Sequence, residues 1–313
     1  MNRALPILQD ATGKSLGPTR RKPEWLKIRP PGGGHYNVLK ERARRLKLAT
    51  VCEEAHCPNI SECWSGGTAT FMLMGDTCTR GCRFCAINTA KRPPALDAEE
   101  PAAIAEAVKE MGLSYVVLTS VNRDELDDGG AGHLRECLDA IHASTPNVLI
   151  EILIPDFEGK QPSIRQIAES NIAVLAHNVE TVRRLTAQVR DRRADYQQSL
   201  DVLAYSKEVR PNLLTKTSLM LGLGESEEEV IECMHDLRKV DCNIVTFGQY
   251  LQPSSKHLSV VEFVHPQVFD RLADIARELG FEYVASGPLV RSSYRAGELY
   301  VERKLRPKLQ QAG

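Results

Sequence analysis

Residues 68–85 read TATFMLMGDTCTRGCRFC, an apolar, β-rich run that is followed directly by three cysteines. Further apolar runs along the chain alternate with helical patterns. Alternation of this kind predicts a parallel sheet covered by helices, and strands covered on both faces are continuously apolar, as these are. The predicted strands are 68–74, 115–120, 148–155, 172–178, 213–221 and 243–251, and the predicted helices are 98–111, 130–144, 163–170, 195–209, 226–239 and 266–279.

Six strand–helix units are too few to close an eightfold barrel, so we expect an α/β fold, an open (β/α)6 partial TIM-type barrel. The barrel is expected over 68–280, with an N-terminal extension over 1–67 and a C-terminal extension over 281–313. Chemistry in βα-barrels takes place on the loops that follow the carboxyl ends of the strands. The three cysteines after the first strand therefore lie where a catalytic loop is expected.

This loop carries Cys78, Cys82 and Cys85 in the spacing C-x3-C-x2-C. Three thiolates can hold three irons of a 4Fe–4S cluster and leave the fourth iron without a protein ligand. A purely electron-carrying cluster normally takes four cysteines, so three of them imply that one iron serves another purpose. Gly81 lets the loop curl tightly, and Phe84 is expected to shield the cluster from water.

A second cysteine group precedes the barrel. Cys52, Cys57 and Cys63 have the spacing C-x4-C-x5-C, and the chain carries RSSYRAG at residues 291–297. Zinc is a weaker interpretation, because structural zinc sites usually pair their ligands as C-x2-4-C, which neither group does twice. A disulfide framework is weaker still, since no secretory signal is evident. The other cysteines are predicted to be small buried hydrophobes; they are Cys137, Cys233 and Cys242.

Taken together, both spacings and the RSSYRAG segment resemble the lipoyl synthases of the radical S-adenosylmethionine superfamily. The resemblance extends over nearly the whole chain, from RKPEWL at residues 21–26 onward. It implies two 4Fe–4S clusters. One is held by Cys78, Cys82 and Cys85 and binds S-adenosylmethionine at its open iron. The other, an auxiliary cluster, is held by Cys52, Cys57, Cys63 and a serine.

The identity of that serine depends on the resemblance. The family pattern places the ligand directly before the tyrosine of the segment, which is Ser293, whereas spacing alone leaves Ser292 and Ser293 open. The implied reaction is a radical sulfurtransferase reaction of lipoate biosynthesis. A radical from S-adenosylmethionine removes hydrogen from C6 and C8 of an octanoyl chain on a carrier-protein lysine, and the auxiliary cluster donates two sulfur atoms. No catalytic residue beyond the cluster ligands is expected.

The resemblance also implies partners. These are octanoylated lipoyl-carrier proteins, namely the E2 subunits of 2-oxoacid dehydrogenases and the H protein of glycine cleavage, together with an electron donor and iron–sulfur carrier proteins. Polar residues and glycines at the strand ends are expected to contact S-adenosylmethionine, although capped helix starts and tight turns are alternatives for the segments that carry glycines. The expected contacts are Asn122, Arg123, Glu151, Asn178, Gly222 and Gly224.

Composition limits the other functions. The net charge of −1 favours neither nucleic acid nor an anionic membrane, and no apolar run reaches the ~20 residues that span a bilayer. The first residues are polar and basic, which allows an organelle-targeting peptide, but a cytoplasmic enzyme is the simpler expectation. Two alternative functions are sulfur insertion into another aliphatic substrate and a structural zinc or cluster module.

Overall fold

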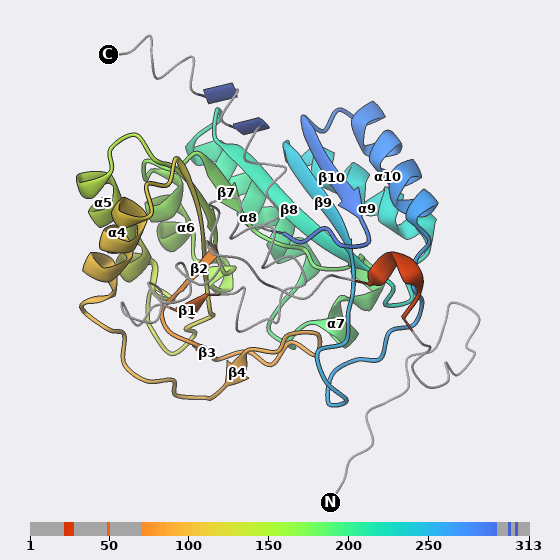
Figure 1. The fold of residues 1–313 in the computed structure, drawn as a ribbon, viewed down its shortest axis with the longest axis horizontal. Coiled ribbons are helices and arrows are strands. Elements are labelled where there is room, and N and C mark those ends of the chain that lie inside the picture. Colours follow the sequence, from red (N-terminus) through yellow and green to blue (C-terminus); the bar gives the residue numbers. More distant parts are fainter. Residues whose placement is uncertain (1–21, 28–48, 51–69, 293–299, 302–303, 306–313) are drawn as a thin grey trace, which may run out of the picture.

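The computed structural model describes residues 22–27, 49–50, 70–292, 300–301 and 304–305. Its main feature is an eight-stranded sheet in the order β1-β2-β5-β6-β7-β8-β9-β10 (Figure 1). Strand β1 (Ala49–Thr50) pairs antiparallel with β2 (Thr70–Leu73), and every other neighbouring pair is parallel. The order does not return to its first strand, so the described strands form an open partial barrel, as predicted.

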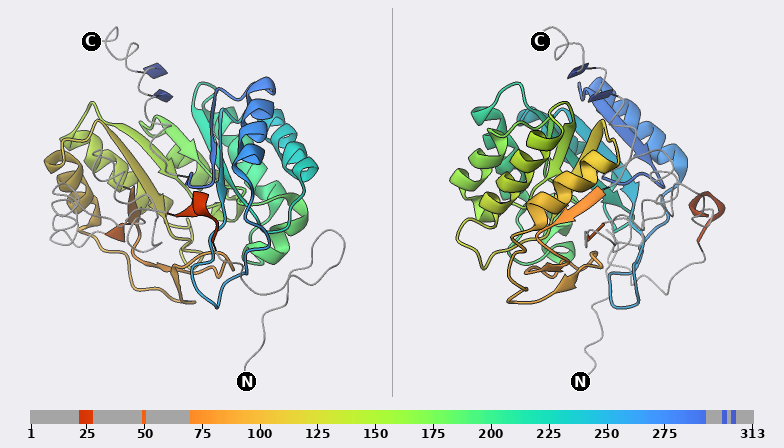
Figure 2. Two further views of the ribbon diagram at one scale, coloured as in Figure 1. Left: turned by 45° about the vertical axis from the view of Figure 1, so that its right-hand side comes forward. Right: turned by 60° about the vertical axis from the view of Figure 1, so that its left-hand side comes forward.

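Helices cover the outer face of this curved sheet (Figure 2). The strands after β2 are β5 (Tyr115–Ser120), β6 (Leu149–Leu153), β7 (Val174–Ala176), β8 (Leu214–Leu221), β9 (Ile244–Gln249) and β10 (Tyr283–Gly287). The long helices are α4 (Glu100–Glu110), α5 (Ala131–Ser144), α6 (Gln161–Ala168), α8 (Tyr196–Val209), α9 (Glu227–Lys239) and α10 (Pro266–Glu278). The predicted strands and helices are thus confirmed to within a few residues. None of the described helices is long and apolar enough to cross a membrane.

Strand β10 was not predicted. It pairs parallel with β9, from Tyr283 opposite Ile244 to Gly287 opposite Gly248. The sheet therefore continues past residue 280, at which the predicted barrel ends. Several short elements were also not predicted; they are β1, β3 (Thr77–Cys78), β4 (Asn88–Thr89), α7 (Thr186–Val189) and the 3-10 helices η1 (Glu24–Leu26), η2 (Phe157–Gly159) and η3 (Arg183–Leu185).

Side-chain caps define the starts of two helices. At α9, the Ser226 hydroxyl accepts a hydrogen bond from the Glu229 N–H (3.3 Å), and the Glu229 carboxylate accepts one from the Ser226 N–H (2.8 Å). At α8, the Asp195 carboxylate accepts from the Gln198 N–H (2.9 Å). Such caps satisfy backbone donors that have no partner within the helix. They explain why the predicted starts of these two helices agree closely with the structure.

Apolar side chains fill both sides of the sheet. Between the strands and helices, residues such as Leu118, Leu134 and Ile150 are fully buried. Inside the barrel, a smaller cluster includes Leu214 and Ile244, and Val301 from the C-terminal part of the chain packs into it. The amino ends of the strands are thereby closed with apolar side chains, which leaves the carboxyl ends for polar groups.

Candidate functional site

The cysteine loop follows β2 at the carboxyl edge of the sheet, as predicted. It is bracketed by β3 and β4, which pair in parallel, and the Ala90 N–H donates to the Cys78 carbonyl (3.1 Å). Cys78, Cys82 and Cys85 are free thiols and partly buried. Phe84 is half-buried and packs against the core, and its shielding of a cluster stays a prediction. The loop is therefore tied to the sheet on both sides.

Backbone N–H groups point at the thiols. Cys78 Sγ accepts from the N–H groups of Arg80 (3.4 Å) and Asn122 (3.3 Å). Cys82 Sγ accepts from the N–H of Asp191 (3.3 Å). Donors of this kind stabilise a thiolate and tune the potential of an iron–sulfur cluster. The donors come from three separate parts of the chain, so the folded barrel arranges them around the loop.

Two of these thiols resist ionisation in the metal-free chain. Burial raises the pKa of Cys82 to about 12, although the Asp191 N–H opposes the shift, and the neighbouring Cys85 raises it further. Burial likewise raises the pKa of Cys85 to about 11, and Cys78 adds to that shift. These mutual effects show that the three thiols lie near one another. A metal centre that binds here must displace their protons.

An ion-pair network supports the loop from inside. The buried guanidinium of Arg80 binds Asp124, with its Nη2 at 2.8 Å from Oδ1, and Asp156, with its Nη1 at 2.6 Å from Oδ2. Asp124 follows β5 and Asp156 follows β6, so one side chain of the loop joins the ends of two further strands. This network was not predicted. The only signals were a charged residue inside the cysteine motif and acidic residues after two strands.

A second clamp lies closer to solvent. The Asp191 carboxylate accepts from the Gly81 N–H (2.8 Å) and pairs with Arg193 (2.8 Å). Arg193 also donates to the Thr79 carbonyl (2.6 Å) and pairs with Asp124 (3.1 Å). Although burial opposes it, the hydrogen bonds from Arg193 and Gly81 hold the pKa of Asp191 well below its usual range. The loop is thus held by charged contacts on its inner and outer sides.

The spacing of the thiols bears on which metal they fit. In a tetrahedral zinc site with Zn–S bonds near 2.3 Å, neighbouring sulfurs are about 3.8 Å apart. Among the described residues, the one group of three potential ligands whose atoms all lie within 4.8 Å of one another is Glu100, His133 and Cys137. The loop cysteines are therefore spread more widely than a single zinc ion requires, which fits a multi-iron cluster.

The Glu100–His133–Cys137 group has a structural role. Glu100 accepts hydrogen bonds from the Met74 N–H (2.8 Å) and from His133 Nε2 (2.7 Å), and Cys137 is fully buried between α4 and α5. The predicted burial of Cys137, Cys233 and Cys242 is confirmed.

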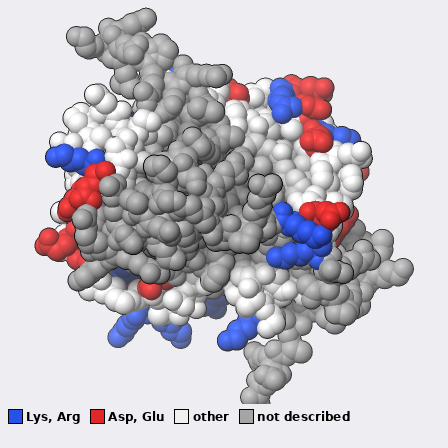
Figure 3. All heavy atoms as spheres, in the orientation of Figure 1, with Lys and Arg blue, Asp and Glu red and all other residues white. Residues whose placement is uncertain are grey.

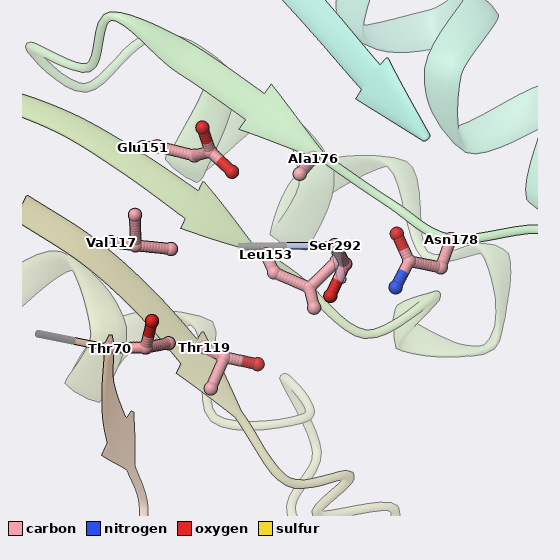
Figure 4. A pocket seen from close by; sticks show the side chains of 8 residues that line it. All are labelled: Thr70, Val117, Thr119, Glu151, Leu153, Ala176, Asn178 and Ser292. Carbon is pink, nitrogen blue, oxygen red and sulfur yellow. The ribbon is translucent and has the colours of Figure 1, made fainter. Parts of the chain in front are cut away.

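A pocket opens inside the barrel (Figure 4). It encloses about 320 Å³ including its open mouth. Its walls carry both polar and apolar side chains from several strands. The lining residues are Thr70, Val117, Thr119, Glu151, Leu153, Ala176, Asn178 and Ser292. A pocket with apolar walls and a few polar groups is typical of a small-molecule site.

Of the expected cofactor contacts, Glu151 and Asn178 line this pocket. Glu151 is engaged, because it pairs with Lys216 (Nζ to Oε1, 2.6 Å) and accepts from the Tyr115 hydroxyl (2.7 Å). Asn178 donates to the Glu180 carboxylate (3.1 Å), and the charge of Glu180 contributes to the raised pKa of both Cys82 and Cys85. Asn178 and Glu180 therefore connect the pocket with the cysteine loop.

Asn122 and Arg123 hold the loop itself. The Asn122 carbonyl accepts from the Thr79 N–H (3.0 Å), in addition to its own N–H contact with Cys78. Arg123 is buried and donates to Glu125 (2.5 Å), to the Met74 carbonyl (3.2 Å) and to the Pro94 carbonyl (2.8 Å). The guanidinium of Arg123 is thus occupied in bracing the loop rather than facing the pocket.

The expected glycine contacts form a turn. Gly222 and Gly224 have φ values of +98° and +104°, which favour glycine. A Cβ on Gly222 would lie 2.4 Å from the Glu262 carbonyl oxygen. The Gly222 and Leu223 N–H groups both donate to Glu225 (2.5 and 3.0 Å). The turn alternative accounts for these glycines; neither lines the described pocket.

Two further polar residues near the strand ends, Asp128 and His177, have structural roles. Asp128 accepts from the N–H groups of Gly130 (2.8 Å) and Gly132 (2.7 Å), so it caps the start of α5. His177 contacts the Ile154 carbonyl (2.9 Å) and Ser199 Oγ (3.0 Å), and burial lowers its pKa to about 4. His177 is a neutral core histidine.

The predicted auxiliary ligands Cys52, Cys57, Cys63 and Ser293 lie outside the described residues. The structure does describe residues that precede two of these ligands, namely Thr50 before Cys52 and Ser292 before Ser293. Strand β1 ends at Thr50 and pairs with β2, with Thr50 opposite Phe71. Ser292 lines the pocket (Figure 4).

Comparison with known proteins identifies two matching family models. Residues 72–237 match the model of the radical SAM superfamily. Residues 8–57 match the model of the N-terminal domain of lipoyl synthase of the radical SAM family.

Curated relatives agree with these models. The mitochondrial lipoyl synthase of Eremothecium gossypii is 55% identical over 93% of this chain and 80% of its own length. That of Caenorhabditis elegans is 55% identical over 91% and 83%. The apicoplast lipoyl synthase of Plasmodium knowlesi is 56% identical over 90% of this chain, which spans 64% of that relative. The expectation of a cytoplasmic enzyme is wrong on this comparison, since these relatives are named as mitochondrial or apicoplast proteins.

Solved structures share the fold. Streptococcus suis SuiB bound to S-adenosylmethionine aligns with a TM-score of 0.54 at 12% identity, over 72% of this chain and 54% of that one. Methylornithine synthase aligns with a TM-score of 0.51 at 14% identity, over 87% and 88%. At these identities the likeness supports the partial-barrel fold alone.

Proposed function

The chain belongs to the lipoyl synthase family of radical S-adenosylmethionine enzymes, and we propose that it inserts two sulfur atoms, at C6 and C8, into a protein-bound octanoyl group. The observation that carries the proposal is the three-thiol loop after β2, which receives backbone N–H donors and is connected through Glu180 and Asn178 to a pocket with apolar and polar walls. When bound, the cluster supplies the electron that cleaves S-adenosylmethionine to the radical that removes substrate hydrogen.

The loop residues hold the cluster in this proposal. Cys78, Cys82 and Cys85 supply three thiolates, and the N–H groups of Arg80, Asn122 and Asp191 reduce the charge on two of those sulfurs. The Arg80 guanidinium keeps the loop against the ends of β5 and β6. A loop fixed in this way limits movement of the sulfurs when the charge of the centre changes.

The pocket residues bind the reactants. Asn178 and Glu180 lie between the loop thiols and the pocket, so they are placed to bind polar groups of S-adenosylmethionine. Apolar walls from Val117, Leu153 and Ala176 suit an alkyl chain. The Glu151–Lys216 pair forms a neutral, hydrogen-bonded part of this interior.

A second 4Fe–4S cluster, on Cys52, Cys57, Cys63 and Ser293, is the proposed sulfur donor. Two positions support it. Thr50, two residues before Cys52, is paired to β2, the strand that leads into the loop, and Ser292 lines the pocket. The chain segments that lead to Cys52 and to Ser293 therefore both lie near β2, since Thr50 pairs with this strand and Ser292 lines the same pocket as Thr70.

The partners follow from this chemistry. We propose octanoylated lipoyl-carrier proteins as substrates, including E2 subunits of 2-oxoacid dehydrogenases and the glycine cleavage H protein. An octanoyl chain on a lysine is long enough to enter a pocket while its carrier stays outside. An electron donor and iron–sulfur carrier proteins complete the set.

The test is anaerobic incubation of the chain, with both clusters rebuilt, with an octanoyl-lysine peptide, a reductant and S-adenosylmethionine. Mass spectrometry is expected to show the peptide with two added sulfur atoms, together with methionine and 5′-deoxyadenosine. Cleavage of S-adenosylmethionine without any sulfur in the peptide would contradict the proposed substrate. Absence of cleavage would contradict the proposed reaction class.

A further inference from the structure

Four exposed cations neighbour residues that hydrogen-bond the loop cysteines: Lys91, Arg92, Arg192 and Lys256, here called the basic ring. Within the described part of the chain, their side chains make no ion pair or hydrogen bond. Figure 3 shows basic side chains along the lower edge of the molecule, below the place where Figure 1 draws β3 and β4. Four unpaired cations next to the partners of one loop need an explanation in a chain of net charge −1.

The backbone ties each part of the ring to one cysteine. Lys91 and Arg92 follow Ala90, whose N–H donates to the Cys78 carbonyl (3.1 Å). Arg192 follows Asp191, whose N–H donates to Cys82 Sγ (3.3 Å).

The third contact completes the ring. Lys256 precedes His257, whose Nε2 donates to the Cys85 carbonyl (2.9 Å). Every loop cysteine therefore has a surface cation within two residues of its hydrogen-bond partner. A path of covalent and hydrogen bonds leads from each cation to the proposed metal centre.

Two of the acidic groups at the loop are already paired with arginines. Asp191 pairs with Arg193 (2.8 Å), and Asp124 pairs with Arg80 (2.8 Å). Asp76, an exposed acid of the same loop, hydrogen-bonds Thr77 Oγ1 (2.9 Å) and offsets one charge of the ring. The ring therefore keeps a local positive surplus that can attract an acidic partner over several ångströms.

A chain of contacts separates the ring from the pocket, and none of the ring residues lines the pocket. Glu180 acts electrostatically on Cys82 and Cys85, and it accepts a hydrogen bond from Asn178, which lines the pocket. The contacts thus run in the order basic ring, cysteines, Glu180, Asn178 and pocket. A carrier protein that delivers an octanoyl chain must face the pocket, whereas electrons can arrive from the ring side.

We propose that the basic ring is the docking surface for an acidic one-electron carrier protein that reduces the cluster on Cys78, Cys82 and Cys85. The inference rests on the function proposed above, because only a cluster that takes up electrons needs a donor at this face. In each transfer the carrier protein loses one electron and the cluster gains it. Complementary charge accelerates the encounter, and close docking matters because electron transfer weakens steeply with distance.

The experiment uses the full chain with both clusters rebuilt under anaerobic conditions. The ring variant combines Arg92→Glu, Arg192→Glu and Lys256→Glu. A matched control makes the same charge change at the C-terminal ends of α4, α9 and α10, at the amino edge of the sheet, with Lys109→Glu, Lys239→Glu and Arg277→Glu. The initial rate of S-adenosylmethionine cleavage is measured with two reductants, a reduced acidic [2Fe–2S] ferredoxin and dithionite.

With ferredoxin at low salt, the rate of the ring variant is expected to fall about tenfold or more, while the control triple variant keeps the wild-type rate. With dithionite, all three proteins are expected to cleave equally. Raising the salt from about 0.02 to about 0.3 M should lower the ferredoxin rate of the wild type toward that of the ring variant, because the charges become screened.

Several results would overturn the proposal. The first is an unchanged ferredoxin rate in the ring variant, and the second is an equal loss with dithionite, which would mean that these residues shape the loop. Weaker binding of an octanoylated carrier domain with an unchanged ferredoxin rate would assign the surface to the substrate carrier instead. If the wild type cleaves S-adenosylmethionine with neither reductant, the proposed function itself fails. If it cleaves with dithionite and only the dependence on the ring is missing, the docking proposal alone fails.

Discussion

The two edges of the barrel differ in what they contain. At the carboxyl edge, the Arg80 guanidinium, two carboxylates and three thiols lie close together, partly or fully buried. At the amino edge, Val301 is buried among apolar side chains, and the polar contacts of Glu282 with Lys304 and Tyr300 lie near the surface. Buried charge is costly unless it is paired, whereas apolar closure is favourable. The comparison indicates that the amino edge serves stability and the carboxyl edge serves chemistry.

The largest expected effect comes from a ligand at the carboxyl edge. Cys82→Ala should abolish S-adenosylmethionine cleavage and lower the iron content from about eight to about four per chain, because one 4Fe–4S cluster loses a ligand. Anaerobic iron analysis and product chromatography measure both quantities. As a control, Cys137→Ala removes a buried thiol between α4 and α5, and it should keep cleavage and iron while losing about 1 kcal/mol of stability. Normal cleavage by Cys82→Ala would contradict the assignment of the loop.

A second change tests the proposed serine ligand of the auxiliary cluster. Ser293→Cys should still assemble the proposed auxiliary cluster but release sulfur poorly, because a thiolate holds iron better than an alkoxide does as the cluster is reduced. Sulfur insertion should fall severalfold while S-adenosylmethionine cleavage stays normal. Ser292→Cys is the matched control, since spacing alone allows either serine. Full sulfur insertion by Ser293→Cys would disprove the argument from ligand lability.

A third change removes charge from the carboxyl edge. Arg80→Met leaves Asp124 and Asp156 without their buried partner and should lower the free energy of unfolding by about 3–5 kcal/mol. Denaturant unfolding of the metal-free chain measures this loss. Arg135→Met breaks an exposed pair with Asp139 and should cost less than about 1 kcal/mol. If both variants lost a similar free energy of unfolding, the buried Arg80 network would contribute no more to stability than an exposed ion pair, which would contradict this prediction.

The smallest effect is expected at the amino edge. Although burial opposes it, hydrogen bonds from Lys304, Tyr300 and Asn243 lower the pKa of Glu282 from its ordinary value of 4.5 to about 2. A lowered folded-state pKa means that these contacts stabilise the protein above about pH 4.5 and that the contribution is lost as the pH falls toward 2.

The matching variant is Lys304→Met. It should cost at most about 1 kcal/mol at neutral pH, because the pair is about one third exposed, and its difference from the wild type should shrink below pH 4.5. Unfolding curves from pH 2 to 7 measure this. Loss of S-adenosylmethionine cleavage in this variant would show that the edges are not separate in function.

Much of the fold was predictable because the strands buried on both faces are continuously apolar. Among the described strands, β10 pairs with β9 alone, and most of its residues are half-buried. It was missed because Tyr283–Gly287 contains no continuous apolar run of the kind that marks a strand buried on both faces. The paired strands β3 and β4, which flank the cysteine loop, were missed because strands of two residues leave no periodic pattern in the sequence.

The site was predictable only where its residues are close in sequence. The cysteine spacing predicted the loop, but the partners of Arg80 lie 44 and 76 residues further along, at Asp124 and Asp156. Only the parallel topology brings these strand ends together. Arg123 is a similar case, because its buried contacts with the Met74 and Pro94 carbonyls depend on how the loop returns to the sheet.

The most direct test of the account is a comparison of cleavage and sulfur transfer in Cys52→Ala. If the two cysteine groups hold two clusters with separate tasks, this variant retains about four irons per chain, still cleaves S-adenosylmethionine and adds no sulfur to an octanoyl-lysine peptide. The account is contradicted if cleavage disappears together with sulfur insertion, or if the unaltered chain itself holds only about four irons.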